Sequence, residues 1–120
     1  MKADALAAAL RQAEPALALE TGASAIALSK GAAGIANGTP VGMVGHDGTP
    51  LAREHLRGAE WAFDAVYTPV ETQFLRDAAA EGLTVISGYE LFIGQGVDAW
   101  TLFTGLPLDE AALRQALVSV

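Results

Sequence analysis

The sequence predicts a single α/β domain built on a mostly parallel sheet of three or four strands. Short apolar runs typical of strands alternate with helical segments along the chain, and the joints between them are brief. Such an alternation implies parallel strands linked by right-handed helical crossovers. A length of 120 residues suits one domain rather than two, so residues 1–120 are expected to form one unit.

The first element is expected to be a helix over residues 4–13. Leu6 and Leu10 are four residues apart, which places both on one helix face. Asp4 is a suitable N-cap, and a proline shortly after the run ends it. The next apolar run, residues 25–28, weakly indicates a strand.

A clearer strand is predicted over residues 33–36, and it leads into a turn at residues 37–40. After this turn, Pro50 suits the first position of a short helix, because its fixed φ and missing amide are tolerated there. Gly58 is expected to end that helix.

The second half of the chain repeats the strand-then-helix pattern. A strand is predicted over residues 63–67, and Thr68 then begins a capping-box pattern that opens a helix to about Ala80. Thr72 is an alternative cap for the same helix. The third strand is predicted over residues 83–86.

Two helices are predicted to close the chain. Ser87, with Glu90 three residues later, again matches a capping box, so a helix is expected from residue 88 to 104, ending at Gly105. Asp109 then begins a last amphipathic helix, with Leu113, Ala116 and Leu117 on one face.

Composition excludes several classes of function. The net charge of −7 and the absence of a lysine and arginine cluster argue against nucleic-acid binding. No cysteine is present, so disulfides and thiolate chemistry are excluded. His46 and His55 are too few for a histidine-built zinc site and are expected to be solvated. No apolar stretch suits a membrane span and no signal-peptide pattern begins the chain, so a cytoplasmic protein is expected.

Three short motifs each begin where an apolar run ends: residues 37–43, residues 64–72 and residues 87–95. In an open parallel sheet the carboxyl edge of the strands is where ligands bind. The motifs therefore predict one flank of a ligand crevice. A complete dinucleotide site would also need a glycine-rich turn after the first strand, and none follows it.

These motifs resemble those of the shikimate dehydrogenase family, including the quinate/shikimate dehydrogenases. The family shows Asn-Ala-Thr-Pro-x-Gly-Met, then Asp-x-x-Tyr-Asn-Pro-x-x-Thr, then a Gly-led helix with a Gln; the resemblance covers roughly residues 33 to 118. It implies the distal half of a three-layer, Rossmann-type dinucleotide-binding domain with its C-terminal helices. It also implies NADP-dependent reduction of 3-dehydroshikimate to shikimate, a step of aromatic amino-acid biosynthesis.

The resemblance implies a cofactor-binding role for four residues. Asn37 and Thr39 would line the dinucleotide, Ala65 would sit beside the nicotinamide, and the backbone of Gly88 would approach that ring. The residues themselves leave alternatives open. Asn37 and Gly38 form a common turn pair whatever the function, and a glycine at position 88 is also explained by close packing of helix on strand.

Tyr67 and Gln95 would be substrate-binding by the same resemblance. Taken alone, Tyr67 could place its ring in the wall of the crevice with its hydroxyl pointing inward, or its ring could simply pack against its neighbours. Gln95 falls at helical spacing on the stripe of Phe92, Ala99 and Phe103, so its amide is expected to be buried and to need a partner, either a ligand or a loop carbonyl. Asp64 is expected to be buried, to need a donor and to be structural.

The sequence departs from the family in ways that bear on function. The catalytic Lys and Asp of the family, its glycine-rich loop and its NADP 2′-phosphate-reading stretch have no counterpart, so no catalytic or metal residue is assigned and the chain is expected to be inactive alone. Thr68, Ser87 and Gly38 differ from the commoner residues and leave shikimate versus quinate open.

Partners follow from the expected sheet edge. Without preceding strands, the strand containing Ile35 would have a free edge, which invites pairing with another chain. A homodimer through this edge, or a complementary N-terminal half, is therefore expected, unless residues 25–28 cover the edge. The alternative function is a non-catalytic interaction module or a binder of a shikimate- or quinate-like small molecule.

Overall fold

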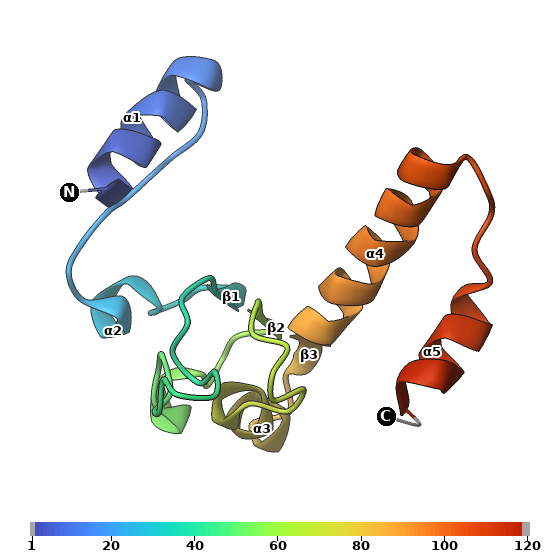
Figure 1. Ribbon diagram of the computed structural model, residues 1–120. Helices are drawn as coiled ribbons and strands as arrows, with labels where there is room; N and C mark the ends of the chain where they lie inside the picture. The colour runs from blue at the N-terminus through green and yellow to red at the C-terminus, as the bar shows by residue number, and fades with distance from the viewer. Residues whose placement is uncertain (1, 119–120) are drawn as a thin grey trace.

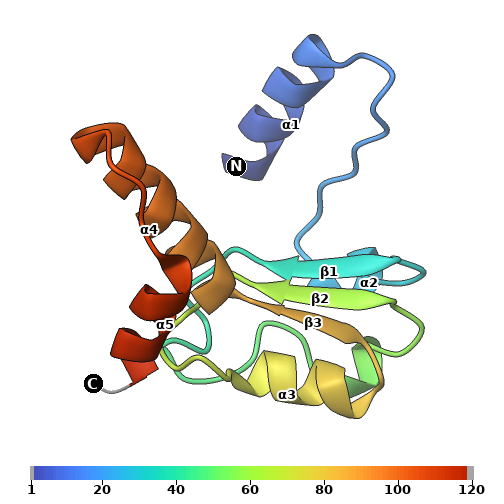
Figure 2. The ribbon, with the colours of Figure 1, turned by 90° about the vertical axis from the view of Figure 1, so that its right-hand side faces the viewer.

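The computed structural model of the chain describes residues 2–118 (Figure 1). Along the chain, its elements are α1 (Lys2–Ala13), α2 (Ala25–Leu28), β1 (Gly34–Asn37), the 3-10 helix η1 (Arg53–His55), β2 (Trp61–Asp64), α3 (Gln73–Ala80), β3 (Thr84–Ser87), α4 (Gly88–Thr104) and α5 (Glu110–Val118). The strands form one sheet in the order β1-β2-β3, and both neighbouring pairs are parallel (Figure 2). The predicted α/β class is confirmed.

The register of the sheet aligns the ends of the strands. Asn37 pairs with Asp64, and Asp64 pairs with Ser87. Because the strands are parallel, the loops that follow them all leave from one edge of the sheet. These residues are also the first residues of the three sequence motifs, so the motifs start in one row across the carboxyl edge.

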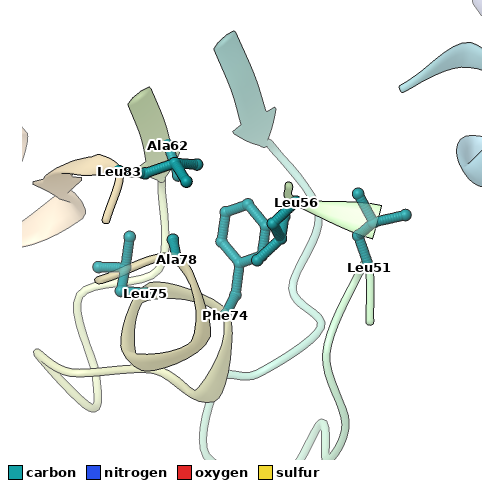
Figure 3. Close-up of a cluster of buried hydrophobic side chains, with 7 residues drawn as sticks. All are labelled: Leu51, Leu56, Ala62, Phe74, Leu75, Ala78 and Leu83. Atoms are coloured by element: carbon teal, nitrogen blue, oxygen red, sulfur yellow. The ribbon is translucent and has the colours of Figure 1, made fainter. Parts of the chain in front are cut away.

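One face of the sheet is covered by α3 and by the segment before β2. Thr72 caps α3, since its Oγ1 accepts a hydrogen bond from the Leu75 amide at 3.3 Å. Glu81, at the end of α3, accepts hydrogen bonds from Arg53 and Arg57 and so ties η1 to this helix. The buried cluster between these elements is drawn in Figure 3 and consists of Leu51, Leu56, Ala62, Phe74, Leu75, Ala78 and Leu83.

The opposite face of the sheet carries Trp61, whose indole lies across Gly34 of the neighbouring strand. A Cβ at Gly34 would come within 1.9 Å of Trp61 Cε2, so the ring takes the place of a side chain there. Trp61 nevertheless remains 39% exposed, and Ile86 on the same face 42%. Helices α1 and α4 stand on this side of the sheet and diverge from each other (Figure 1).

Helix α1 is held by the segment that follows it. Arg11 Nη2 donates to the Leu19 carbonyl at 2.6 Å, and Thr21 Oγ1 donates to Asp4 Oδ1 at 2.8 Å. The bond from Thr21 lowers the pKa of Asp4 below its usual value. Leu6 on this helix is 60% exposed. Figure 2 shows α1 beyond β1, away from the strands.

Three local expectations were wrong. Residues 25–28 form helix α2 rather than a strand, because Ser24 Oγ accepts a hydrogen bond from the first turn and caps it. Asp4 lies within the first turn of α1 and is not its N-cap. Pro50 does not open a helix, since Leu51 turns into the core and only the single turn η1 follows.

The boundaries of β2 and α3 also differ from the prediction. Strand β2 ends at Asp64, so the strand expected over 63–67 begins and ends too late and Tyr67 lies in the loop after it. Thr68 does not cap α3; the alternative cap, Thr72, does. The difference matters because the loop of residues 65–71 is then free to line the carboxyl edge.

The closing helices follow the prediction more closely. Ser87 caps α4, accepting from the Tyr89 amide at 3.2 Å, and Gly105 ends it with a left-handed φ of 68°. Glu90 does not complete the capping box, because its carboxylate binds Arg114 instead. In the part of the chain that the structure describes, no helix is long and apolar enough to cross a membrane.

Candidate functional site

Asp64 is fully buried at the end of β2 and lies at the centre of a hydrogen-bond network. Its Oδ1 accepts from the Val66 amide and from Asn37 Nδ2, both at 3.0 Å, and its Oδ2 accepts from Thr72 Oγ1 at 2.6 Å. The expectation that a buried Asp64 needs donors is confirmed. The carboxylate joins the loop after β1, the loop after β2 and the start of α3.

Asn37 shapes the turn that follows β1. Its Oδ1 accepts from the amide of Thr39 at 3.0 Å and from the hydroxyl of Thr39 at 2.7 Å. Its Nδ2 donates to the Val41 carbonyl at 3.1 Å as well as to Asp64. The side chain is 3% exposed, and its donors and acceptors are used within the protein. Gly38 and Thr39 therefore form the outer surface of this turn.

A hollow of about 240 Å³ lies between the two loops that Asp64 joins. This volume is below the roughly 300–1,000 Å³ of sites that enclose a drug-sized ligand, so it suits a single ring rather than a large molecule. Its lining is mostly apolar. The lining residues are Gly38, Thr39, Pro40, Met43, Ala65, Val66, Tyr67 and Thr68.

Tyr67 stands at this hollow with its ring stacked on Phe92 of α4. The ring centroids are 4.8 Å apart and the planes differ by 14°. Offset stacking at this distance is attractive beyond the area it buries. Tyr67 is 47% exposed, so α4 orients its ring while leaving about half of the residue open to solvent.

Gly88, the first residue of α4, is buried against the end of β2. A Cβ there would lie 2.5 Å from the Ala65 carbonyl oxygen and 2.7 Å from that of Asp64. Backbone packing alone therefore requires glycine at this position. The same contact fixes Ala65, and with it one wall of the hollow, against the start of α4.

Charged side chains beside the site join α4 to α5. Arg114 donates to both carboxylate oxygens of Glu90, at 3.1 and 2.8 Å, and to Glu110 at 2.8 Å. The hydrogen bond from Arg114 lowers the pKa of Glu90, and the two carboxylates raise the pKa of Arg114. An apolar hollow of about 320 Å³ lies between the two helices, beginning at Phe92.

No family model matches the chain. It is 42% identical over 86 residues to the quinate/shikimate dehydrogenase (NAD(+)) of Corynebacterium efficiens, and 42% identical over 76 residues to the shikimate dehydrogenase (NADP(+)) of an Arthrobacter species. Its structure matches that of the quinate dehydrogenase from Corynebacterium glutamicum in complex with NAD, with a TM-score of 0.82, 36% identity and 98% of this chain covered. The chain is a homologue of shikimate and quinate dehydrogenases.

The likeness is to the C-terminal, NADP-binding portion of these dehydrogenases. The match to the C. efficiens relative covers 72% of this chain and 30% of the relative, and the match to the Arthrobacter relative covers 63% and 26%. The structural match covers 43% of the C. glutamicum chain, so this chain spans less than half the length of each relative. Shikimate 5-dehydrogenase from Thermus thermophilus, in complex with NADP(H) and shikimate, matches with a TM-score of 0.69 and 33% identity, over 92% of this chain and 40% of that one.

The site fits the nicotinamide end of such a dinucleotide and not its pyrophosphate. The hollow has the size of one ring, and Gly38 places no side chain within it. A pyrophosphate is held by amides of a glycine-rich turn at a helix start. The pattern Gly-x-Gly-x-x-Ala does occur at 94–99, but these residues lie inside α4, where the amides bond along the helix.

Gln95 is exposed on α4, so the expectation that its amide would be buried was wrong. Phe103 on the same predicted stripe is 84% exposed. The helical spacing placed these residues on one face correctly, but within residues 2–118 that face is covered only near Phe92, which stacks on Tyr67, and is open to solvent at Gln95 and Phe103. Within this range no three His, Asp or Glu side chains gather as metal ligands.

Two features of the site were missed by sequence reasoning. One is the stacking of Tyr67 on Phe92, for which residues 25 apart carry no local signal. The other is Met43, which lines the hollow although it belongs to the first motif. The glycine directly before it was an available clue, because glycine allows the chain to turn back, and Gly42 has a φ of 96° here.

Proposed function

We propose that the chain supplies the distal half of a shikimate dehydrogenase-like active site, which reduces 3-dehydroshikimate to shikimate, or acts on quinate, with a nicotinamide dinucleotide. The row of Asn37, Asp64 and Ser87 at the carboxyl edge carries this proposal, because it brings the first two motifs together around one ring-sized hollow. The third motif supports that hollow from behind, with Gly88 packed on Ala65 and Phe92 stacked on Tyr67. The dinucleotide supplies the hydride when bound. NADP follows from the resemblance, while the C. glutamicum relative holds NAD.

Within this half-site the residues divide by what they offer a ligand. Ala65 and Thr39 are walls of the hollow and would border the nicotinamide. Asn37 and Gly88 would act through the backbone that they position, because the Asn37 side chain is bonded internally and Gly88 is packed on Ala65. We propose these four residues as the cofactor-binding residues, following the family resemblance.

Tyr67 and Gln95 are the proposed contacts with the substrate. Tyr67 is half exposed and its ring is held by Phe92, and its hydroxyl can donate to or accept from a hydroxyl of a cyclic polyol. Gln95 is exposed on α4, three residues beyond Phe92, and its amide is available to a ligand. Neither residue is assigned a proton transfer, and the proton donor would come from the complementary half.

The test is reconstitution. The chain would be co-expressed with the part of C. glutamicum quinate dehydrogenase that it does not match, and oxidation of shikimate and quinate followed with NAD⁺ and NADP⁺. Activity that needs both polypeptides, and a kcat/KM lowered about tenfold or more by Tyr67→Phe, is expected. Tyr89→Phe, on the neighbouring helix α4, is the matched control and should leave kcat/KM nearly unchanged.

Two results would count against this proposal. Turnover by the pure chain would show that the half-site is complete by itself. A co-purifying pair that binds no nucleotide and oxidises neither substrate would show that the edge of the sheet serves another purpose.

A second candidate function is a non-catalytic interaction module, favoured by the free edge of β1. It would form a homodimer through that edge or pair with a complementary N-terminal half. Size-exclusion chromatography at high concentration tests the homodimer, and a clean monomer argues against it. Binding of shikimate or quinate without nucleotide would instead indicate a small-molecule binder. A cytoplasmic location stays a prediction.

A further inference from the structure

Two contacts join the loop after β2 to the first turns of α4. Gly88 packs on the carbonyl of Ala65, where an added Cβ would come within 2.5 Å of the oxygen. One helical turn later, Phe92 stacks on Tyr67 with the ring centroids 4.8 Å apart. Residues four apart lie on the same face of a helix, so a single face of α4 makes both contacts. The first contact places the helix against the loop, and the second places a ring against Tyr67.

The Phe92 ring stands on a well-packed part of α4. Ser87 caps this helix, its Oγ accepting from the Tyr89 amide at 3.2 Å, and Ile93, next to Phe92, is 1% exposed. Tyr89 adds a second ring contact to Phe92, with centroids 6.5 Å apart and planes tilted by 33°. Phe92 therefore has support from its own helix besides its contact with Tyr67.

The Tyr67 ring has no comparable support from its own segment. The backbone around it is fixed, since the amide of Ala65 and the carbonyl of Thr68 make backbone hydrogen bonds of 2.9 and 3.1 Å. The Tyr67 hydroxyl has no hydrogen bond within residues 2–118, and the residue is 47% exposed. In that range its ring contact is the stack on Phe92. Phe92 thus decides the orientation of this side chain and not the path of its backbone.

A loose Tyr67 ring would present its hydroxyl in several places. A tyrosine side chain has alternative staggered positions about χ1, and each carries the hydroxyl to a different point. Stacking favours an aromatic pair by roughly two- to twelvefold over the separated rings, which biases Tyr67 toward one position. Misplacing an orienting group by about 1 Å can slow a reaction about a hundredfold. The stack therefore matters for chemistry through where it leaves the hydroxyl.

Phe92 does not itself line the hollow that Tyr67 borders. The lining comes from the loops after β1 and β2, whereas Phe92 lies on α4, on the far side of the stack. A ligand in the hollow would touch Tyr67 and not Phe92. An effect of Phe92 on a reaction there has to pass through Tyr67, which separates its role from that of a residue in contact with the ligand.

We propose that Phe92 is a positioning residue, which holds the Tyr67 ring so that its hydroxyl meets a cyclic polyol at one fixed point beside the hollow. The inference rests on the proposed function, which supplies the substrate contact of Tyr67, and it adds a source of discrimination. A hydroxyl held in one place distinguishes between ring substituents, whereas a hydroxyl that moves accepts several. Phe92 therefore controls the ratio of the kcat/KM values for shikimate and quinate, which differ around their rings.

The first test observes Tyr67 in the isolated chain. The chain has two tyrosines, so 3-fluorotyrosine labels two sites for fluorine NMR, and Tyr89→Phe assigns them. Phe92→Leu keeps an apolar side chain without a ring and should move the Tyr67 signal toward that of free fluorotyrosine, whereas Phe92→Trp should keep it shifted. Phe103→Leu removes an 84% exposed ring from the same helix and is the matched control. Equal unfolding midpoints by circular dichroism ensure that a moved signal is not a lost fold.

The second test uses the reconstituted pair of polypeptides. Phe92→Leu should lower kcat/KM about fivefold for the better of the two substrates, bring the two kcat/KM values closer together, and leave the Kd of the nucleotide unchanged. Phe92→Trp and Phe103→Leu should keep the original values. Adding Phe92→Leu to Tyr67→Phe should lower kcat/KM no further than Tyr67→Phe alone, because both substitutions act through one hydroxyl.

The outcomes separate this inference from the proposed function. A Tyr67 signal that is the same in the original chain and in Phe92→Leu would overturn the inference, whatever the activity. An active pair in which Phe92→Leu has no effect, or an effect that adds in full to that of Tyr67→Phe, would overturn it as well. An inactive pair would refute the proposed function, and the Tyr67 signal would still decide whether Phe92 holds that ring.

Discussion

Asp64 shows how one buried carboxylate can shape a site that it does not enter. A carboxylate without partners is costly to bury, and here three donors from three segments converge on it. Asp64 does not line the hollow. It acts by holding the loops after β1 and β2 together. Its importance should therefore appear in stability as much as in ligand binding.

Asp64→Ala should lower the free energy of unfolding by at least about 3 kcal/mol, because it leaves Asn37 Nδ2, the Val66 amide and the Thr72 hydroxyl without their acceptor. Urea unfolding followed by circular dichroism measures the change. Asp77→Ala on the exposed face of α3 is the control and should change stability by less than about 0.5 kcal/mol. Similar losses for the two variants would mean that the network is not the main contribution of Asp64.

Two glycines of the same helix should respond to alanine with opposite signs. Gly88→Ala puts a methyl group 2.5 Å from the Ala65 carbonyl and should cost about 1–3 kcal/mol. Gly94→Ala meets nothing within 4 Å and should gain about 1 kcal/mol from better helix propensity. Thermal unfolding of both variants tests this, and a Gly88→Ala protein as stable as the original would refute the close packing.

At individual residues, the sequence predicted where a residue lies relative to the strands and helices better than it predicted which residues surround its side chain. Asn37 and Ser87 could be placed directly after predicted strands, because apolar runs stop there, whereas Asp64 was placed inside a strand predicted over residues 63–67 and is in fact the last residue of β2. Gln95 could not be placed, because helical spacing says which residues share a face and not whether another element covers that face. The stacking of Tyr67 on Phe92 depends on how α4 leaves the sheet, which no local pattern encodes.

Among the elements, helix starts were predictable where the cap also has a tertiary partner. Thr68 and Thr72 are both acceptable caps by residue type, and Thr72 is chosen because its hydroxyl also donates to Asp64. The 25–28 run shows the opposite limit. Four apolar residues suit a short strand or a short helix equally, and the preceding Ser24 decided the outcome.

Helix α5 should detach as pH falls below the ordinary Glu90 pKa of 4.5. Arg114 lowers the pKa of Glu90 in the folded protein, so its stabilising contribution is present above 4.5 and is lost as pH falls through the lowered value. Hydrogen exchange, corrected for intrinsic rates, should show protection of α5 falling as the pH drops below 4.5, before that of α3.

Arg114→Met provides the control for this pH dependence. It keeps a long side chain on α5 and removes both ion pairs, so α5 should be less protected at neutral pH and less sensitive to acid. Salt should weaken α5 in the original chain and have little effect in the variant. An acid response that persists in Arg114→Met would assign the opening to other groups.

For the whole molecule, the alternation of strands and helices was sufficient to predict a parallel α/β sheet, because few topologies satisfy it. The open shape was only partly predictable. A free edge was expected at the Ile35 strand, and β1 is an outer strand of the sheet formed by the described residues. The separation of α1 from the sheet was not foreseen, since its leucine face looks like that of any core-facing helix.

Helix α1 should be largely unprotected in the isolated chain. It has twelve residues, which is marginal for a helix without tertiary packing, and its bonds run to its own following segment. Hydrogen exchange should be fast over Lys2–Ala13 and slow over α3. Equal protection of α1 and α3 in the free chain would contradict this.

The internal bonding of Asn37, Asp64 and Thr72 has a consequence for the entropy of assembly. The loops around the hollow are ordered when this chain folds, so a ligand or a partner does not have to immobilise them on arrival. The cost of ordering falls instead on α1 and α5, at the two ends of the chain. Affinity could therefore be tuned by substitutions in these helices, tens of residues from the hollow, while the shape that discriminates between ligands stays the same.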